Sequence, residues 1–213
     1  MDNYIKTLIL CEGHSEESFI KRILAPYLEL NGIFVRPIVL NGVSRYAGIR
    51  KELKRLGKDS SAKLTTMLDY YKLPQDTPGV KEQKQKTKKP EEIASDIEKR
   101  IRIDLQNDLK CREFFPYIQM HEYEALLFSD INSFKIIGMN DAMIKKLKSE
   151  VIKFPTPEHV NNSEQTAPSK RILRVYEQYQ KVSDGTIIAK VIGIERMIEK
   201  CPHFARWVKK LQQ

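Results

Sequence analysis

Short continuous apolar runs alternate with longer, helix-like segments along roughly the first 130 residues. The apolar runs are bounded by turn residues and predict four β-strands, at residues 4–11, 33–40, 64–68 and 114–120. Between them, apolar residues recur every three or four positions and predict helices, at residues 16–30, 46–56 and 90–105. This alternation is typical of an α/β protein with a mostly parallel four-stranded sheet that is flanked by helices.

Single residues refine two of these elements. Ser15 is expected to cap the first helix, with Glu16 and Glu17 in its first turn, where acidic side chains suit the helix dipole. Pro37 lies inside the second strand. Because proline donates no backbone hydrogen bond, it indicates a strand at the edge of the sheet or one with an irregular start.

The pattern changes after Ser129 to helices and loops. Helices are predicted at residues 131–152, 169–180 and 193–211, with a polar loop at 155–168. We therefore expect an α/β core at residues 1–130, which includes a flexible basic loop at about 75–90. Residues 131–213 are expected to form a helical extension that packs on this core.

Charge adds a hypothesis about the partner. The 213 residues contain 37 Lys and Arg against 28 Asp and Glu, which gives a formal charge of +9. This excess favours nucleic acid as a partner, although a basic surface can also serve solubility alone. The three cysteines are far apart and lack the spacing of a zinc site, and no apolar stretch suits a signal peptide or a membrane span. These features predict a cytoplasmic protein that does not bind membranes.

Acidic residues follow three of the four predicted strands. Glu12 follows the first strand, Asp69 the third, and Glu122 and Glu124 the fourth. Ligand sites of α/β sheets form beyond the carboxyl ends of the strands, and oxygen-only ligand sets suit Mg²⁺ or Mn²⁺. Each residue alone could be a turn former or a helix cap; their coincidence at one edge predicts a metal site. If residues 121–124 are extended, both glutamates point to one side, whereas in a helix only one faces the site.

Basic and aromatic residues could complete such a site. Ser169, Lys170 and Arg171 open a predicted helix and could bind a substrate phosphate, or they could be an ordinary capped helix start. His121 is a candidate acid or base, or a structural histidine. Tyrosines beside the acids could stack on bases or pack the sheet edge: Tyr70, Tyr71 and Tyr123. The chain contains no P-loop and no G-x-S-x-G motif.

Four ordered motifs resemble those of DUF4276, a Toprim-like family, over nearly the whole chain. They are LILCEGHSEESF, TTMLDYYKLP, IQMHEYEALLFSD, and APSKRIL with CPHFARWVKKL. The resemblance implies that Glu12 and Glu16 are the acidic pair of the opening Toprim motif. The metal-binding DxD motif of Toprim domains reads Asp69-Tyr70-Tyr71 here, so its second acid is replaced. A tyrosine is a poor Mg²⁺ ligand near neutral pH, so the metal site is either defective or completed by another acid, for which Glu122 or Glu124, or less favourably Asp76, is the candidate.

Toprim domains also occur in OLD-type nucleases linked to phage defence. By this resemblance we expect a Mg²⁺- or Mn²⁺-dependent nuclease with metal ligands among Glu12, Glu16, Asp69, Glu122 and Glu124, which works with a separately encoded ATPase. The alternative is a non-catalytic scaffold or effector that binds nucleic acid or the ATPase. A phosphotransferase or nucleotide-handling enzyme is a third hypothesis. Substrate type, sequence preference, oligomeric state and activation trigger stay open.

Overall fold

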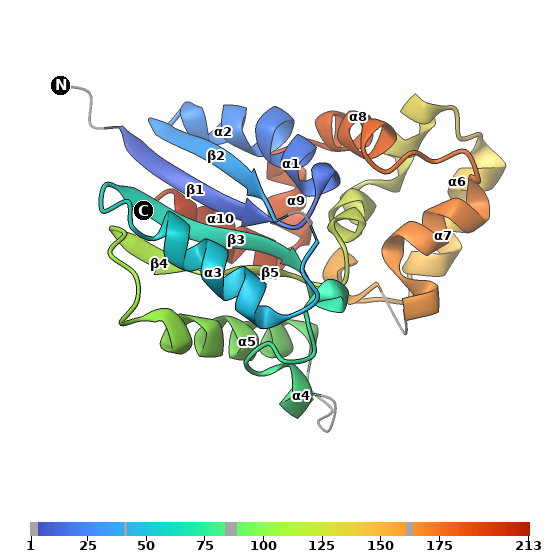
Figure 1. The fold of residues 1–213 in the computed structure, drawn as a ribbon. Helices are drawn as coiled ribbons and strands as arrows, with labels where there is room; N and C mark the ends of the chain where they lie inside the picture. The colour runs from blue at the N-terminus through green and yellow to red at the C-terminus, as the bar shows by residue number, and fades with distance from the viewer. Residues whose placement is uncertain (1–3, 41, 84–88, 161–163) are drawn as a thin grey trace.

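A single parallel sheet organises the chain. The computed structural model describes residues 4–40, 42–83, 89–160 and 164–213. The strands are β1 (Ile5–Cys11), β2 (Ile33–Val39), β3 (Ala62–Asp69), β4 (Glu113–Phe115) and β5 (Ile118–Gln119). They run in the order β2-β1-β3-β4, with β5 also paired to β3, and every pairing is parallel (Figure 1). The predicted α/β fold with a mostly parallel sheet is thereby confirmed.

The two sides of the sheet differ in how regular they are. β2 pairs only with β1 among the described strands, with Pro37 opposite Ile9, so the edge position predicted from Pro37 is confirmed. On the other side, the predicted fourth strand is divided into β4 and β5 at Pro116. The Thr66 hydroxyl bonds to the backbone of Tyr117 here, accepting from N–H at 2.8 Å and donating to C=O at 2.7 Å.

Helices of the first half follow the predicted order. The first helical segment is continuous through α1 (His14–Phe19), the π-helical η1 (Ile20–Leu24) and α2 (Ala25–Glu29). The predicted Ser15 cap is wrong: Gly13 is the N-cap, and its N–H donates to the Glu16 carboxylate at 2.9 Å. The other helices are α3 (Tyr46–Leu56) and α5 (Pro90–Leu105).

The predicted basic loop is partly structured. After β3 come a 3-10 turn, η2 (Tyr70–Lys72), and a short helix, α4 (Val80–Gln83). Leu73 and Val80 are buried against the core, which explains why this stretch is not a free loop. Residues 84–88 of the basic run lie outside the described residues.

The second half is helical but more divided than predicted. It contains η3 (Tyr123–Ser129), η4 (Ile131–Ile137), α6 (Asp141–Val151), η5 (Pro157–His159), η6 (Glu164–Thr166), α7 (Pro168–Val175), α8 (Ser183–Ile192), α9 (Ile194–Lys200) and α10 (Pro202–Leu211). The helix expected at 131–152 is broken at Gly138, whose φ is +91°. The helix expected at 169–180 ends at Val175, the one expected at 193–211 is divided before Pro202, and α8 was not predicted.

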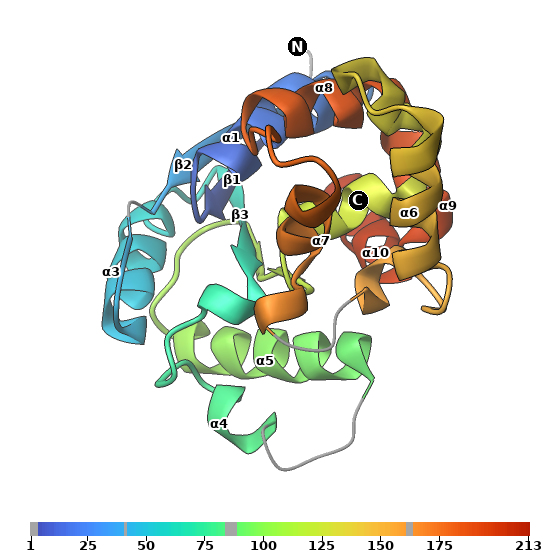
Figure 2. The same ribbon diagram turned by 90° about the vertical axis from the view of Figure 1, so that its right-hand side faces the viewer.

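Two apolar clusters lie on opposite faces of the sheet. α3 and α5 cover one face (Figures 1 and 2). The first helical segment covers the other together with α9 and α10, while α8 packs against the first helical segment beyond the end of the sheet, so both halves of the chain build one core there. Among the described helices, none is long and apolar enough to cross a membrane.

Candidate functional site

Carboxylates gather where β1 and β3 end. Glu12 follows β1 directly, Asp69 is the last residue of β3, and Glu16 points back from the first turn of α1. Glu124 comes from η3, which follows β5. Asp69, Glu16 and Glu124 are only 2%, 5% and 2% exposed, so three acidic side chains are withdrawn from water at one edge of the sheet.

These carboxyl groups influence one another. Burial is the first cause that raises the pKa of Asp69 well above its ordinary value. The second cause is the negative charge around it, which belongs to Glu16, Glu12 and Glu124. Burial and Glu12 likewise raise the pKa of Glu16. The fold therefore brings together four of the five acids predicted as metal ligands, and their mutual repulsion is incompletely neutralised.

Two lysines lie against this cluster. Lys72 Nζ is 2.6 Å from Glu12 Oε1, and Lys181 Nζ is 3.4 Å from Glu122 Oε1 and 3.5 Å from Glu124 Oε1. Neither lysine was predicted from the sequence. Lys72 lies in the turn after Asp69. Lys181 comes from the loop before α8, far along the chain from the strands whose ends carry the acids.

Glu122 and Glu124 have different environments. The backbone is extended at Glu122 and helical from Tyr123, so the segment contains both of the conformations that the sequence left open. Burial would raise the pKa of Glu122, but the hydrogen bond from Ser169 and the charge of Lys181 lower it overall. The Ser169 backbone nitrogen lies 2.9 Å from Glu122 Oε2. Burial raises the pKa of Glu124 to about 7 despite Lys181. Glu124, rather than Glu122, is the glutamate that acts on Asp69.

His121 has a strained backbone and a buried ring. Its φ is +67°, in the left-handed region, and its ring stacks on Tyr71 with centroids 5.3 Å apart. Burial, followed by His159, lowers the pKa of His121 to about 4, so the ring is neutral near pH 7. Its role as an acid or base stays a prediction. Tyr123 was a stacking candidate, and this is wrong: it is fully buried and donates to Gly185 C=O at 3.0 Å.

The residues expected to bind phosphate have other partners. The Ser169 N–H donates to Glu122, and Arg171 is 3% exposed and bonds to Glu150 at 3.3 Å. Lys170 is exposed on the same helix. Phosphate binding here stays a prediction, with Lys170 in the most accessible position. Asp76 is not near the cluster's ion pairs: it accepts from the Tyr46 N–H at 3.0 Å, at the start of α3.

The carboxylate oxygens of the cluster are ligands that suit a hard cation, but lysine side chains are paired with several of them. Asp69 Oδ1 is buried and makes no hydrogen bond, which is costly unless a cation is near, and Glu124 Oε1 makes none either but lies 3.5 Å from Lys181 Nζ. In the part of the chain that the structure describes, however, no three His, Cys, Asp or Glu side chains are grouped closely enough to hold a metal ion. A divalent ion would therefore have to displace Lys72 or Lys181 from the carboxylates.

The fold and the site define an α/β protein with buried carboxylates at the carboxyl edge of a parallel sheet. A family model described as "Domain of unknown function (DUF4276)" matches residues 11–212, and the chain belongs to this family. The resemblance predicted from the four motifs is confirmed. No curated protein sequence matches the chain.

Solved structures offer a distant likeness. The C-terminal region of the OLD protein of Xanthomonas campestris pv. campestris, phased with iodine, is 15% identical, with a TM-score of 0.46 over 97% of this chain and 93% of that one. The same region phased with mercury is 14% identical, with a TM-score of 0.46 over 97% and 94%. At such values the likeness carries no information about activity.

Proposed function

We propose that the protein is a divalent-metal-dependent nuclease whose site is the carboxylate cluster at the ends of β1 and β3. The observation that carries this proposal is the excess of carboxyl groups over cations. Lys72 pairs with Glu12, and Lys181 pairs with Glu122 and Glu124, whereas Asp69 and Glu16 are buried beside them and form no ion pair with a described residue. Buried acids with raised pKa values are characteristic of functional sites, because folding alone does not favour them.

The residues divide into ligands and charge partners. Asp69 and Glu124 offer buried oxygens without hydrogen bonds, and Glu12 and Glu16 add oxygens beside them. These four would hold Mg²⁺ or Mn²⁺, which when bound activates water and stabilises charge on the phosphoryl oxygens. Lys72 and Lys181 neutralise the carboxylates otherwise, and once released they are positioned to neutralise a substrate phosphate.

Cleavage assays test this function. Plasmid DNA and a single-stranded RNA are incubated with the protein in Mg²⁺, in Mn²⁺ and in EDTA. Metal-dependent cleavage is expected, with a loss of at least a hundredfold, about 3 kcal/mol, in Glu12→Gln and Asp69→Asn. Glu17→Gln is the matched control, since Glu17 lies next to Glu16 in α1 but pairs with Lys21 and His14 at the surface. No cleavage of either substrate in either metal would contradict the proposal.

A non-catalytic scaffold or effector is the second candidate. It is favoured by the lysine ion pairs, by the absence of a three-ligand group among the described residues, and by Tyr71 in place of the second acid. Terbium luminescence separates the two candidates independently of cleavage. If the site is a nuclease site, the protein should bind Tb³⁺, and Asp69→Asn should weaken this binding whereas Glu17→Gln should not. If the protein is a scaffold with closed ion pairs, neither the wild type nor either variant should bind Tb³⁺.

The resemblance to Toprim domains, which also occur in OLD-type nucleases, supports two further parts of the proposal: a role in anti-phage defence and a separately encoded ATPase as partner. Co-purification of the tagged protein with an ATPase encoded beside it tests the partnership. A cell carrying Asp69→Asn should lose phage resistance while the complex persists. Persistence of resistance in that variant would separate defence from catalysis.

A further inference from the structure

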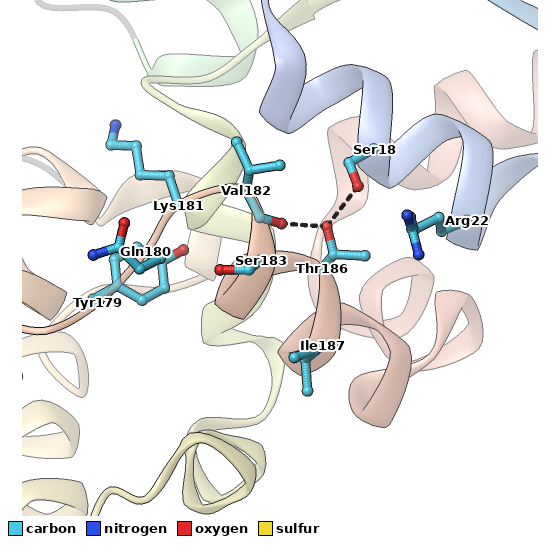
Figure 3. A pocket seen from close by; sticks show the side chains of 9 residues that line it. All are labelled: Ser18, Arg22, Tyr179, Gln180, Lys181, Val182, Ser183, Thr186 and Ile187. Carbon is cyan, nitrogen blue, oxygen red and sulfur yellow. Dashed lines mark hydrogen bonds between the residues drawn. The ribbon is translucent and has the colours of Figure 1, made fainter.

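A pocket of about 670 Å³ opens beside the carboxylate cluster, between the first helical segment and the start of α8 (Figure 3). It is lined by Ser18, Arg22, Tyr179, Gln180, Lys181, Val182, Ser183, Thr186 and Ile187. Its volume lies within the range of small-ligand sites, about 300–1,000 Å³. Lys181 belongs to both places, because it lines the pocket and its ammonium group meets Glu122 and Glu124. Lys181 therefore links the pocket to the cluster.

Arg22 gives the pocket its positive charge. The other charged lining residue, Lys181, pairs with Glu122 and Glu124, and none of the nine lining residues is acidic. Arg22 is exposed and forms no ion pair with any residue in the described ranges. A cation that folding leaves without an ion pair is available for an anionic ligand.

Neutral groups in the pocket suit the rest of a nucleotide. Hydroxyl groups lie on the wall between the two helices, where Thr186 Oγ1 is 2.9 Å from Ser18 Oγ and donates to Val182 C=O at 2.6 Å (Figure 3). Val182 and Ile187 are exposed apolar side chains at the same place. Hydroxyl and apolar surface next to a guanidinium matches the alternation of phosphate and sugar along a nucleic-acid strand.

We infer that this pocket binds the phosphodiester backbone of a nucleic-acid strand and holds it against the carboxylate cluster, with Arg22 as the phosphate contact. The inference rests on the proposed function, since it assigns the substrate path to that same site. Arg22 makes contact at a distance from the acids, so it acts in binding and not in metal coordination. Affinity, measured without cleavage, is therefore the appropriate readout.

The test compares Arg22→Ala with Arg102→Ala. Arg102 is an exposed arginine of α5 that likewise forms no ion pair with a described residue, and α5 lies on the opposite face of the sheet. Both variants lose one charge. Binding of fluorescein-labelled single-stranded DNA and RNA is followed by anisotropy in Ca²⁺ and in EDTA, over a series of salt concentrations.

Arg22→Ala should weaken binding about tenfold and reduce the slope of log K against log salt by about 0.7, the value for one phosphate contact on a single strand. Arg102→Ala should leave the slope unchanged. Arg22→Glu should weaken binding further, and because Arg22 is exposed, the thermal unfolding midpoint should not fall in either variant. Equal affinities and slopes for Arg22→Ala and Arg102→Ala would overturn the inference.

Further outcomes separate the inference from the proposed function. Arg22-dependent binding without cleavage in Mg²⁺ or Mn²⁺ would support the binding role of the pocket and contradict the nuclease activity. Cleavage that Arg22→Ala leaves unchanged would support the nuclease activity and contradict the binding role of the pocket. Inorganic phosphate serves as the competitor: Arg22-dependent binding of phosphate alone, with no binding of either oligonucleotide, would also overturn the inference.

Discussion

Burial determines the chemistry of Glu124. The side chain is 2% exposed, and its one strong cationic neighbour, Lys181, is shared with Glu122. Desolvation therefore outweighs the attraction of the lysine, and the carboxyl group titrates near neutrality instead of in acid. A folded protein that keeps such a group loses stability wherever the carboxyl group has to ionise.

The pH dependence of stability tests this view of Glu124. Its pKa is about 7 in the fold, against an ordinary value of 4.5. Between these values the native state binds more protons than the unfolded chain, so Glu124 lowers the free energy of unfolding as pH rises from 4.5 to 7. The full loss is of the order of 3 kcal/mol. Glu124→Gln should therefore flatten the decline of the thermal midpoint over this range.

Denaturation followed by circular dichroism from pH 4.5 to pH 8 provides the measurement. Glu124→Gln should match the wild type at the acid end and exceed it at pH 8. Glu17→Gln should retain the wild-type decline, because the pKa of Glu17 is lowered by Lys21 and not raised. Parallel curves for Glu124→Gln and the wild type would show that Glu124 titrates normally.

At the residue scale, the sequence revealed the acids and missed their partners. Glu12 and Asp69 could be predicted because each directly follows an apolar strand, and parallel strands end at one edge. Lys181 could not, because only tertiary packing brings the loop before α8 to Glu122. Glu158 was missed for a similar reason: it is buried and accepts from the N–H groups of His203 and Phe204 at 2.9 and 2.8 Å, at the start of α10.

At the element scale, a strand or helix could be predicted where the sequence pattern that defines it lies within the element itself. β1 and α3 were predicted because an apolar run and a helical period are complete within a few residues. The break between β4 and β5 depends on Thr66 of a neighbouring strand, which supplies hydrogen bonds to Tyr117 where the ladder stops. The start of α10 depends likewise on the distant Glu158. Such features are determined by contacts between elements and leave no periodic pattern in the chain.

Thr66→Val tests the link between β3 and the β4–β5 break. The substitution keeps the shape and the β propensity but leaves the buried N–H and C=O of Tyr117 without the Thr66 hydroxyl. It should lower the free energy of unfolding by about 1–3 kcal/mol, the cost of unsatisfied buried polar groups. Urea denaturation provides the measurement.

Thr7→Val is the matched control in β1. Thr7 is fully buried, and its hydroxyl makes no hydrogen bond, so valine removes an unsatisfied polar group there. This variant should be as stable as the wild type or more stable. An equal destabilisation by both substitutions would mean that the Thr66 hydrogen bonds contribute nothing beyond the shape of the side chain.

At the scale of the whole molecule, the two halves of the chain share one apolar cluster. Phe19 of the first helix lies 5.1 Å from Tyr123 and 6.1 Å from Phe204, between ring centroids. Trp207 of α10 stacks on Tyr117 at 4.3 Å and donates to the hydroxyl of Thr65 in β3 at 2.9 Å. These contacts join the last helix to the central strand, and they make the helical extension part of the support on which the carboxylate edge is built.

Truncation tests whether residues 1–130 can fold without that support. Removing residues 131–213 takes away the C-terminal side chains of the shared cluster, among them Ile188, Met197, Phe204, Trp207 and Leu211. Each such side chain contributes about 1.5–3 kcal/mol by burial, so the burial of these five alone is comparable with the typical total stability of a domain, about 5–15 kcal/mol. The fragment should therefore show no cooperative thermal transition, whereas a chain that lacks only Gln212 and Gln213 should melt like the full protein. A sharp transition in the fragment would instead establish residues 1–130 as an independent domain, with the extension acting on substrate or partner and not on folding.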